Sequence, residues 1–167
     1  MIRDGMTTAL YPGSFDPIHL GHVQVIEVAS RAFDHVIVAA MFNPQKSTTM
    51  FELETRVEMI KESCEHLDNV EVISFSALVV DAAASIGADV IVKGLRTSGD
   101  FESELRMAQT NKSLTGIDTL FVPADPAVAF LASTYVREVF KLGGSVDHMV
   151  PTASARGLAA WRKSNNQ

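Results

Sequence analysis

Short apolar runs alternate with longer stretches of helical periodicity along this chain of 167 residues. The apolar runs are almost continuous and rich in β-branched residues, as in strands that are covered on both faces of a parallel sheet. They predict five strands, at residues 7–11, 36–41, 70–75, 89–92 and 119–122. Strands that alternate with helices in this way are typical of βαβ units.

The intervening stretches predict six helices. In the second of them, Leu53, Val57, Ile60 and Cys64 recur at the spacing of one helical face. The helices are expected at residues 21–32, 52–66, 78–86, 101–112, 134–142 and 152–162. The pattern predicts an α/β fold, a Rossmann-like doubly wound five-stranded parallel sheet with helices on both faces and a C-terminal helical extension. We expect one domain over residues 1–167, with loose termini at 1–6 and 163–167.

Composition narrows the class of protein. The formal net charge of -6 argues against general electrostatic binding of nucleic acid but permits a small anionic ligand in a local cationic pocket. The single cysteine, Cys64, cannot form an intramolecular disulfide and is expected to be a packed thiol in a reducing compartment. No signal peptide and no apolar stretch of membrane-spanning length is recognisable, so we expect a cytoplasmic protein without a membrane partner.

Polar residues directly after the predicted strands are the candidates for function, because ligands of an open parallel sheet bind beyond the carboxyl ends of its strands. Four such segments are GSFDPIHLGH at 13–22, NPQK at 43–46, KGLR at 93–96 and PADPAVAFLAST at 123–134. In the first segment, Pro17 keeps Asp16 out of helical geometry, so the helix must begin after it. The backbone N–H groups at that helix start would form an anion site, with His19 and His22 on one side of the first turn.

The first segment resembles the H/T-x-G-H signature of the nucleotidyltransferases, which join a nucleotide to a second substrate and release pyrophosphate. Within that superfamily, the chain resembles the bacterial phosphopantetheine adenylyltransferases over most of its length. The matching segments are YPGSFDP, FDHVIVA, NPQK, MFELETRVEMI, VKGLRTSGDFESE and VREV, in order from Tyr11 to about Val139. The resemblance implies transfer of the adenylyl group of ATP to 4′-phosphopantetheine, which gives dephospho-coenzyme A and pyrophosphate.

Such a transfer needs no general base, because a phosphate-monoester nucleophile is already ionised at neutral pH. It needs groups that bring two anions together and stabilise charge on the α-phosphate. We expect His22 to stabilise the transition state, Ser14 to position the phosphates and Lys46 to hold the nucleophilic phosphate. Lys46 alone could equally be a solvated surface lysine, and the family match at NPQK favours the functional role. Arg96 completes the predicted catalytic group, because its planar guanidinium can pair two phosphate oxygens at once.

The resemblance also implies a larger set of binding residues. Lys93 would meet the phosphopantetheine side and Glu104 the ribose or adenine, while Ser133 or Thr134 would cap a helix beside the β- and γ-phosphates. The implied ATP-binding residues are Ser14, Phe15, His22, Gly94, Leu95, Arg96, Glu104, Val128, Ala129, Phe130, Leu131, Ala132, Ser133 and Thr134. The implied acceptor-binding residues are Ser14, Lys46, Val79 and Lys93.

Cofactor and partners are implied by the resemblance alone. Mg²⁺ is implied by ATP chemistry and would be held largely by substrate phosphates, so no protein ligand for the metal is predicted. A homohexamer, and coenzyme A as a feedback inhibitor in the same pocket, are also implied.

Three positions depart from the family pattern. His19 replaces the usual threonine, as in nicotinate-nucleotide and cytidylyl relatives, Ala132 replaces one serine of a triplet, and Ser103 replaces an aromatic residue. Two alternatives therefore stay open. One is a sister adenylyltransferase that acts on nicotinate mononucleotide or another phosphate acceptor, and the other is a nucleotide-binding regulatory module without turnover. Retention of His22 together with Lys46 and Arg96 argues against the second.

Overall fold

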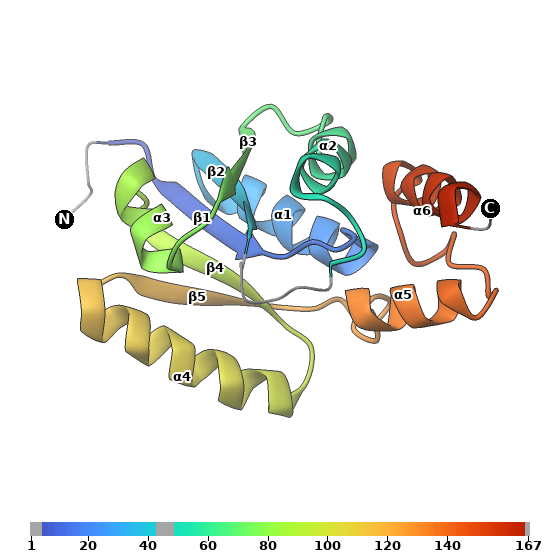
Figure 1. Ribbon diagram of the computed structural model, residues 1–167. Coiled ribbons are helices and arrows are strands. Elements are labelled where there is room, and N and C mark those ends of the chain that lie inside the picture. Colours follow the sequence, from blue (N-terminus) through green and yellow to red (C-terminus); the bar gives the residue numbers. More distant parts are fainter. Residues whose placement is uncertain (1–4, 43–48, 166–167) are drawn as a thin grey trace.

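Five parallel strands form the sheet of the computed structural model, which describes residues 5–42 and 49–165 (Figure 1). The strands are β1 (Thr8–Gly13), β2 (His35–Met41), β3 (Val70–Phe75), β4 (Val90–Leu95) and β5 (Asp118–Pro123). Their order across the sheet is β3-β2-β1-β4-β5, so the strand order reverses between β1 and β4. The predicted doubly wound α/β fold is confirmed, and its switch point is where ligands of such sheets bind.

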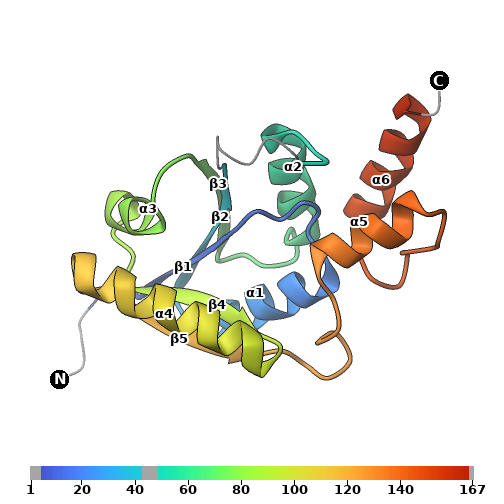
Figure 2. The same ribbon diagram turned by 60° about the horizontal axis from the view of Figure 1, so that its bottom comes forward.

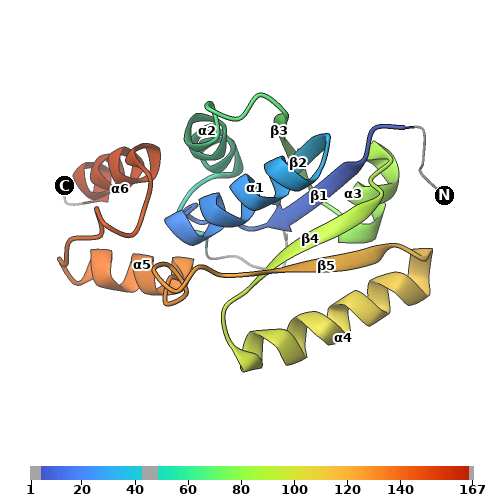
Figure 3. The same cartoon turned by 180° about the vertical axis from the view of Figure 1, so that it is seen from behind.

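Six helices accompany the sheet in the described residues: α1 (Leu20–Ala32), α2 (Leu53–Ser63), α3 (Val79–Ile86), α4 (Ser98–Thr115), α5 (Ser133–Lys141) and α6 (Thr152–Asn165). Helix α3 lies in front of the sheet in Figure 1, and α4 lies below β5 in the same view and contacts both β5 and α3. Helices α1 and α2 pack on the opposite face, which Figure 3 shows. Helices α5 and α6 form the expected C-terminal extension, beyond the carboxyl ends of the strands.

Alternation along the strands divides the core between the two faces of the sheet. In β1, Ala9 and Tyr11 belong to the cluster that also contains residues of α1 and α2, whereas Leu10 belongs to the cluster that contains residues of α3. Ile26 of α1 and Ile60 of α2 are fully buried in the first cluster. Burial of each such side chain contributes about 1.5–3 kcal/mol. Side chains of β1 are therefore packed in both core clusters, one on each face of the sheet.

The C-terminal extension packs against the first turn of α1. Ser154 of α6 is fully buried, and its hydroxyl donates a hydrogen bond of 2.8 Å to the carbonyl of Ile18. The Leu20 N–H donates to the Met149 carbonyl at 3.0 Å. Figure 2 shows α5 and α6 together at this end of the molecule. The extension therefore supports the segment that joins β1 to α1.

The boundaries of β4 and α4 differ from expectation. Strand β4 extends through Leu95, because its pairing with β5 continues to the end of both strands. Residues 93–95 therefore belong to the strand, and only Arg96 of the KGLR segment follows it. Helix α4 begins at Ser98, three residues earlier than expected, because the Thr97 side chain caps it by accepting the Asp100 N–H at 3.2 Å.

Helix α6 also extends farther than expected. It runs to Asn165, so residues 163–165, which were expected to be loose, are helical. The Asn165 side chain donates to the Trp161 carbonyl at 2.8 Å. The cationic side chains of Arg162 and Lys163 lie in the last turn, where they interact favourably with the helix dipole.

Two expectations from composition can be compared with the structure. Cys64, which follows α2, is buried, and burial raises the pKa of its thiol to about 11, in agreement with a packed thiol. Within residues 5–42 and 49–165, no helix has the length and apolar character needed to cross a membrane.

Candidate active site

Two adjoining hollows open at the carboxyl ends of β1 and β4. The first, of about 170 Å³, lies between the tips of these strands, and the second, of about 400 Å³, lies between the β1–α1 turn and the start of α5. Phe15, His19, His22 and Arg96 border both hollows. The site thus offers two adjacent compartments around one pair of histidines.

The turn between β1 and α1 contains a residue in an uncommon backbone conformation. Phe15 has a φ of 47°, in the left-handed region. Its ring is 2% exposed and packs edge-on against Tyr11 and His22, with ring centroids 5.4 and 4.9 Å away. A left-handed phenylalanine is strained unless its surroundings determine it, and this packing supplies part of that constraint.

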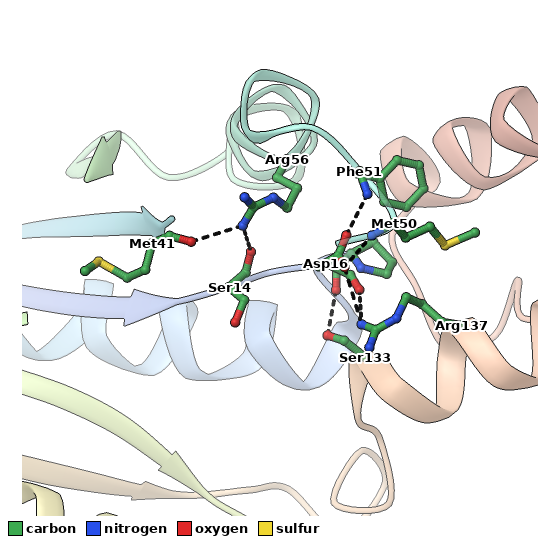
Figure 4. Close-up of polar contacts among 9 residues, drawn as sticks. Ser14, Asp16, Met41, Met50, Phe51, Arg56, Ser133 and Arg137 are labelled. Carbon is green, nitrogen blue, oxygen red and sulfur yellow. Dashed lines mark hydrogen bonds and ion pairs between the residues drawn. The ribbon is translucent and has the colours of Figure 1, made fainter. Parts of the chain in front are cut away.

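Asp16 joins the same turn to two other segments, as Figure 4 shows. Its buried carboxylate accepts the N–H groups of Met50 at 2.8 Å and Phe51 at 2.9 Å. Arg137 of α5 donates to the Asp16 carbonyl and forms an ion pair with the Asp16 carboxylate at 3.6 Å. The turn is therefore bound to the segment before α2 and to the first turns of α5.

His19 and His22 cap the start of α1 reciprocally. The His22 N–H donates to Nδ1 of His19 at 3.3 Å, and the His19 N–H donates to Nδ1 of His22 at 3.2 Å. The two rings stack with centroids 3.7 Å apart. Because each Nδ1 accepts a hydrogen bond, each neutral ring carries its proton on Nε2. The departure at His19 has a local explanation, since its ring supplies the cap that a threonine hydroxyl could also supply.

Both histidines are neutral at physiological pH. Burial lowers the pKa of His22 well below its ordinary value of 6.5, and His19, Arg96 and Lys93 lower it further. Burial and the charge of Arg96 lower the pKa of His19 to about 4. A neutral imidazole that is fixed in one tautomer is a preorganised hydrogen-bond donor. His22 can therefore donate to a phosphate oxygen without first binding a proton.

Charged residues reach the site from the end of β4. Arg96 donates from Nε and Nη2 to Asp100, at 2.9 and 3.1 Å, and from Nη1 to the Leu131 carbonyl at 2.7 Å. These bonds use three of its five N–H donors, so two remain for a ligand. Lys93 forms an ion pair with Glu104 at 3.3 Å. The structure thus brings these predicted residues to one edge of the site.

The start of α5 differs from the expected cap. Ala132, not Ser133 or Thr134, is the N-cap residue, and its methyl side chain makes no cap hydrogen bond. Ser133 is already helical, and its hydroxyl donates to the Pro17 carbonyl at 2.8 Å. Ala132, Ser133 and Thr134 line the second hollow. The first N–H groups of α5, without a side-chain cap, are suited to an anion there.

The other predicted residues are distributed unevenly. Four more line the hollows, namely Ser14, Gly94, Glu104 and Val128. Leu95, Ala129, Phe130 and Leu131 line neither, and Phe130 is 57% exposed while Leu131 is buried. Val79 is the first residue of α3 and packs against the core cluster on that face, apart from both hollows. Lys46 lies outside the described residues.

Five polar residues at the site were not predicted from the sequence: Tyr11, Asp16, Thr49, Arg56 and Arg137. Arg56 carries a usable signal, because it follows Leu53 by three residues and precedes Ile60 by four, on an otherwise apolar helix face. A charged residue at such a position needs a specific partner. Tyr11, Asp16 and Arg137 lie in segments that match the family, but their sequence positions alone assign them no role.

The described residues contain no group of three or more His, Cys, Asp or Glu side chains arranged to hold a metal ion. The donors around the second hollow include hydroxyl, imidazole and guanidinium groups, and the Asp16 carboxylate there is already bonded. Mg²⁺ prefers several free carboxylate, carbonyl or water oxygens. A magnesium ion at this site would therefore depend on phosphate oxygens of the nucleotide.

A further hollow, of about 620 Å³, lies between α5 and α6. None of the predicted site residues that the structure describes lines it, so its size alone gives no reason to place the chemistry there.

Comparison with known proteins places the part of the chain that forms both hollows in one family. The family model of the cytidylyltransferase-like proteins matches residues 10–139. A phosphopantetheine adenylyltransferase from Picosynechococcus sp. is 50% identical over 156 residues, which is 93% of this chain and 87% of that relative. Both matches include the turn after β1 and the start of α5.

Solved structures share the fold at low sequence identity. A provisionally assigned nicotinate-nucleotide adenylyltransferase from Vibrio parahaemolyticus superposes with a TM-score of 0.66 at 18% identity, over 93% of this chain and 99% of that chain. A bifunctional NMN adenylyltransferase/ADP ribose pyrophosphatase from Francisella tularensis gives 0.70 at 17% identity, over 96% of this chain and 50% of that chain. These likenesses concern the fold alone.

Proposed function

Since the chain belongs to the cytidylyltransferase-like family and, within it, to the phosphopantetheine adenylyltransferases, we propose that it transfers the adenylyl group of ATP to 4′-phosphopantetheine. The products are dephospho-coenzyme A and pyrophosphate. The observation that carries the proposal is the neutral His22 between two hollows, with Nδ1 engaged in the helix cap and the Nε2 proton left for a ligand.

His22 acts by stabilising charge on the α-phosphate. In the transfer, a phosphate oxygen of the acceptor forms a bond to the α-phosphorus, and the bond from that phosphorus to the pyrophosphate oxygen breaks. No proton has to be removed from the ionised acceptor, so a fixed donor is more useful here than a base. The lowered pKa of His22 supports this role, because the ring stays a donor of one defined tautomer.

The triphosphate lies in the second hollow, between Arg96 and the start of α5. Support comes from the two unused N–H donors of Arg96 and from the α5 N-terminus, which no side chain caps. Ser14 lines the same hollow and positions phosphate oxygens through its exposed hydroxyl. Arg137, which also lines it, adds positive charge at this end.

The acceptor binds on the other side of His22, toward Lys93 and the first hollow. Lys93 lies there in an ion pair with Glu104. Lys46 holds the nucleophilic phosphate, as the family match at NPQK indicates. Val79 contacts the acceptor only if the acceptor extends past the sheet edge toward α3, since it lines neither hollow.

Magnesium, subunit assembly and regulation belong to the same proposal. Mg²⁺ would be held by the phosphates of ATP and would supply counter-charge there, and the hydroxyl groups of Ser14 and Thr134 line the hollow in which those phosphates are proposed to lie. The protein works in the cytoplasm as a homohexamer, and coenzyme A competes for the acceptor compartment. Gel filtration with light scattering tests the hexamer, and inhibition kinetics against each substrate test the competition.

The deciding assay incubates the protein with ATP, Mg²⁺ and one acceptor at a time, and measures pyrophosphate and the mass of the adenylylated product. We expect turnover with 4′-phosphopantetheine and none with nicotinate mononucleotide or nicotinamide mononucleotide. ATP binding without turnover on any acceptor would instead identify a regulatory module.

One observation favours the second candidate, adenylylation of nicotinate mononucleotide. His19 is the residue of the nicotinate-nucleotide relatives. However, His19 is 4% exposed and its ring is engaged in capping α1, so its presence is accounted for without any effect on the acceptor. In the same assay, product from nicotinate mononucleotide alone would establish this candidate.

A further inference from the structure

Arg56 is a buried cation behind the β1–α1 turn. It lies in the first turns of α2, and the whole residue is 1% exposed. Its Nη1 donates to the Ser14 carbonyl at 2.5 Å and to the Met41 carbonyl at 3.2 Å, while its Nε finds no hydrogen-bond partner among the described residues. A buried guanidinium is costly, because desolvation opposes its charge. Packing alone therefore does not explain an arginine at this position.

The contact to Ser14 fixes a peptide plane in the turn. In Figure 4 the Ser14 carbonyl points toward Arg56, and the Ser14 hydroxyl points away from it. The peptide between Ser14 and Phe15 is trans, since the cis peptide among the described residues is the one before Pro17. In a planar trans peptide the C=O and the following N–H point in opposite directions. Holding the Ser14 carbonyl therefore directs the Phe15 N–H away from Arg56.

The side away from Arg56 is the side of the hollows. Ser14 and Phe15 both line the second hollow, together with His22. Among the described residues, no acceptor is assigned to the Phe15 N–H. The same Phe15 has a φ of 47°, so its amide has an orientation that the chain would not adopt without outside constraint. An unpartnered amide beside a cavity with Arg96 and an uncapped helix start is suited to an anion.

We propose that Arg56 is a positioning residue for the adenylyl transfer: by holding the Ser14 carbonyl, it aims the Phe15 N–H at a phosphate oxygen of the nucleotide. This inference rests on the proposed function for its phosphate ligand. Arg56 itself touches no substrate, because it lies behind the turn. Its second bond, to Met41 at the end of β2, keeps the tips of β1 and β2 at a fixed separation.

The test compares Arg56→Met and Arg56→Lys with the wild-type protein, and with Lys61→Met as a control that removes an exposed cation from the same helix. For each protein, thermal unfolding reports folding, steady-state kinetics report kcat and KM for ATP, and ¹H–¹⁵N spectra report the Phe15 amide during titration with pyrophosphate. We expect that amide to shift strongly in the wild type and in Lys61→Met. In Arg56→Met we expect the shift to be lost and kcat/KM to fall roughly 100-fold, the effect of removing one phosphate donor.

Arg56→Lys keeps a buried donor with a different reach, so its Phe15 shift and its turnover should both be intermediate and should change together. A merely structural role would lower the unfolding temperature without this correlation. A folded variant whose turnover falls while Phe15 responds as in the wild type contradicts the proposal. So does a wild-type Phe15 amide that does not respond to pyrophosphate, and this result decides the matter even if Arg56→Met fails to fold.

The spectra also separate this inference from the proposed function. If the wild type binds pyrophosphate through Phe15 but has no turnover with 4′-phosphopantetheine, the proposed acceptor is wrong and the role of Arg56 stands. If turnover is as proposed and Phe15 does not respond, the role of Arg56 is wrong and the function stands.

Discussion

The tips of β1 and β4 meet at the same site but handle charge differently. At the β1 tip the groups left free to face the hollows are two neutral histidines, a hydroxyl and backbone N–H groups, because the Asp16 carboxylate there is already bonded to two backbone N–H groups and to Arg137. At the β4 tip they are full charges, each already opposed by a carboxylate, in the pairs Arg96–Asp100 and Lys93–Glu104.

This difference separates two tasks that a transfer between anions requires. The β1 donors are fixed by caps and packing, so they can stabilise charge that develops during the reaction at no cost of reorganisation. The side chains of the β4 pairs are 26–35% exposed, so solvent reaches their charges, which can attract and hold phosphates, while the screened pairs contribute little to stability. Substitutions at the β1 tip should therefore affect turnover, and substitutions at the β4 tip should affect binding.

The largest effect is expected for His22→Ala. Loss of the neutral donor should raise the barrier by about 2–4 kcal/mol and lower kcat roughly 30- to 1,000-fold, while the Kd for ATP changes only a few-fold. Steady-state kinetics and calorimetry of ATP binding check this. His148→Ala, which removes an exposed histidine, is the matched control. Equal losses in kcat and in ATP affinity would contradict the assignment of His22 as the group that stabilises the transition state.

A smaller effect of the opposite kind is expected for Arg96→Ala. Removing a charged donor of phosphate should weaken ATP binding roughly 10- to 100-fold, with a smaller change in kcat at saturating ATP. Arg106→Ala is the control, because Arg106 lies on α4, is 80% exposed and pairs with Glu102. Unchanged ATP affinity in Arg96→Ala would remove the distinction between the two tips.

Lowering the pH should destabilise the fold, because His19 and His22 at the β1 tip bind protons more readily in the unfolded chain. Because the pKa of His19 is about 4 in the folded chain and near 6.5 when unfolded, the unfolded chain binds more protons between these values, and His22 shifts in the same direction. The free energy of unfolding should fall as pH decreases from 6.5 toward 4, by up to about 1.4 kcal/mol per pH unit for each histidine. Denaturant titrations over this range check the slope. His19→Thr should make it shallower, and an unchanged slope in that variant would contradict the shift.

The smallest effect concerns the cap itself. His19→Ala removes the side-chain acceptor for the His22 N–H and should lower the free energy of unfolding by about 1 kcal/mol, whereas His19→Thr should restore most of it. Denaturant unfolding at pH 8 checks both. If His19→Thr changed which phosphate substrate the enzyme prefers to adenylylate, the explanation of His19 as a helix cap alone would be wrong.

Much of the fold and of the two strand tips could be predicted from the sequence. The strands, their polar tips and the pair of histidines follow from periodicity and from one ten-residue segment, because that information is local. Helix α4 begins three residues before its expected start, because Thr97 caps it, and the α5 N-cap is Ala132 where Ser133 or Thr134 was expected. The start of α4 depends on a single side-chain hydrogen bond, and at the start of α5 the N-cap residue makes none, so neither boundary shows clearly in the sequence.

The residues that were missed depend on contacts between distant segments. Asp16 binds backbone groups that lie 34 and 35 residues away, and Arg56 binds a carbonyl 42 residues away. Every turn has backbone carbonyls, so the sequence does not mark the carbonyl of Ser14 or indicate which side chain donates to it. Only the position of Arg56 on an apolar helix face was a readable signal.

The most direct test of the central claim is the reaction in reverse. Incubated with Mg²⁺, pyrophosphate and dephospho-coenzyme A, the wild-type protein should form ATP and 4′-phosphopantetheine, and His22→Ala should form ATP at a small fraction of that rate. Formation of ATP from nicotinate adenine dinucleotide but not from dephospho-coenzyme A, or equal rates for the two proteins, would contradict the account.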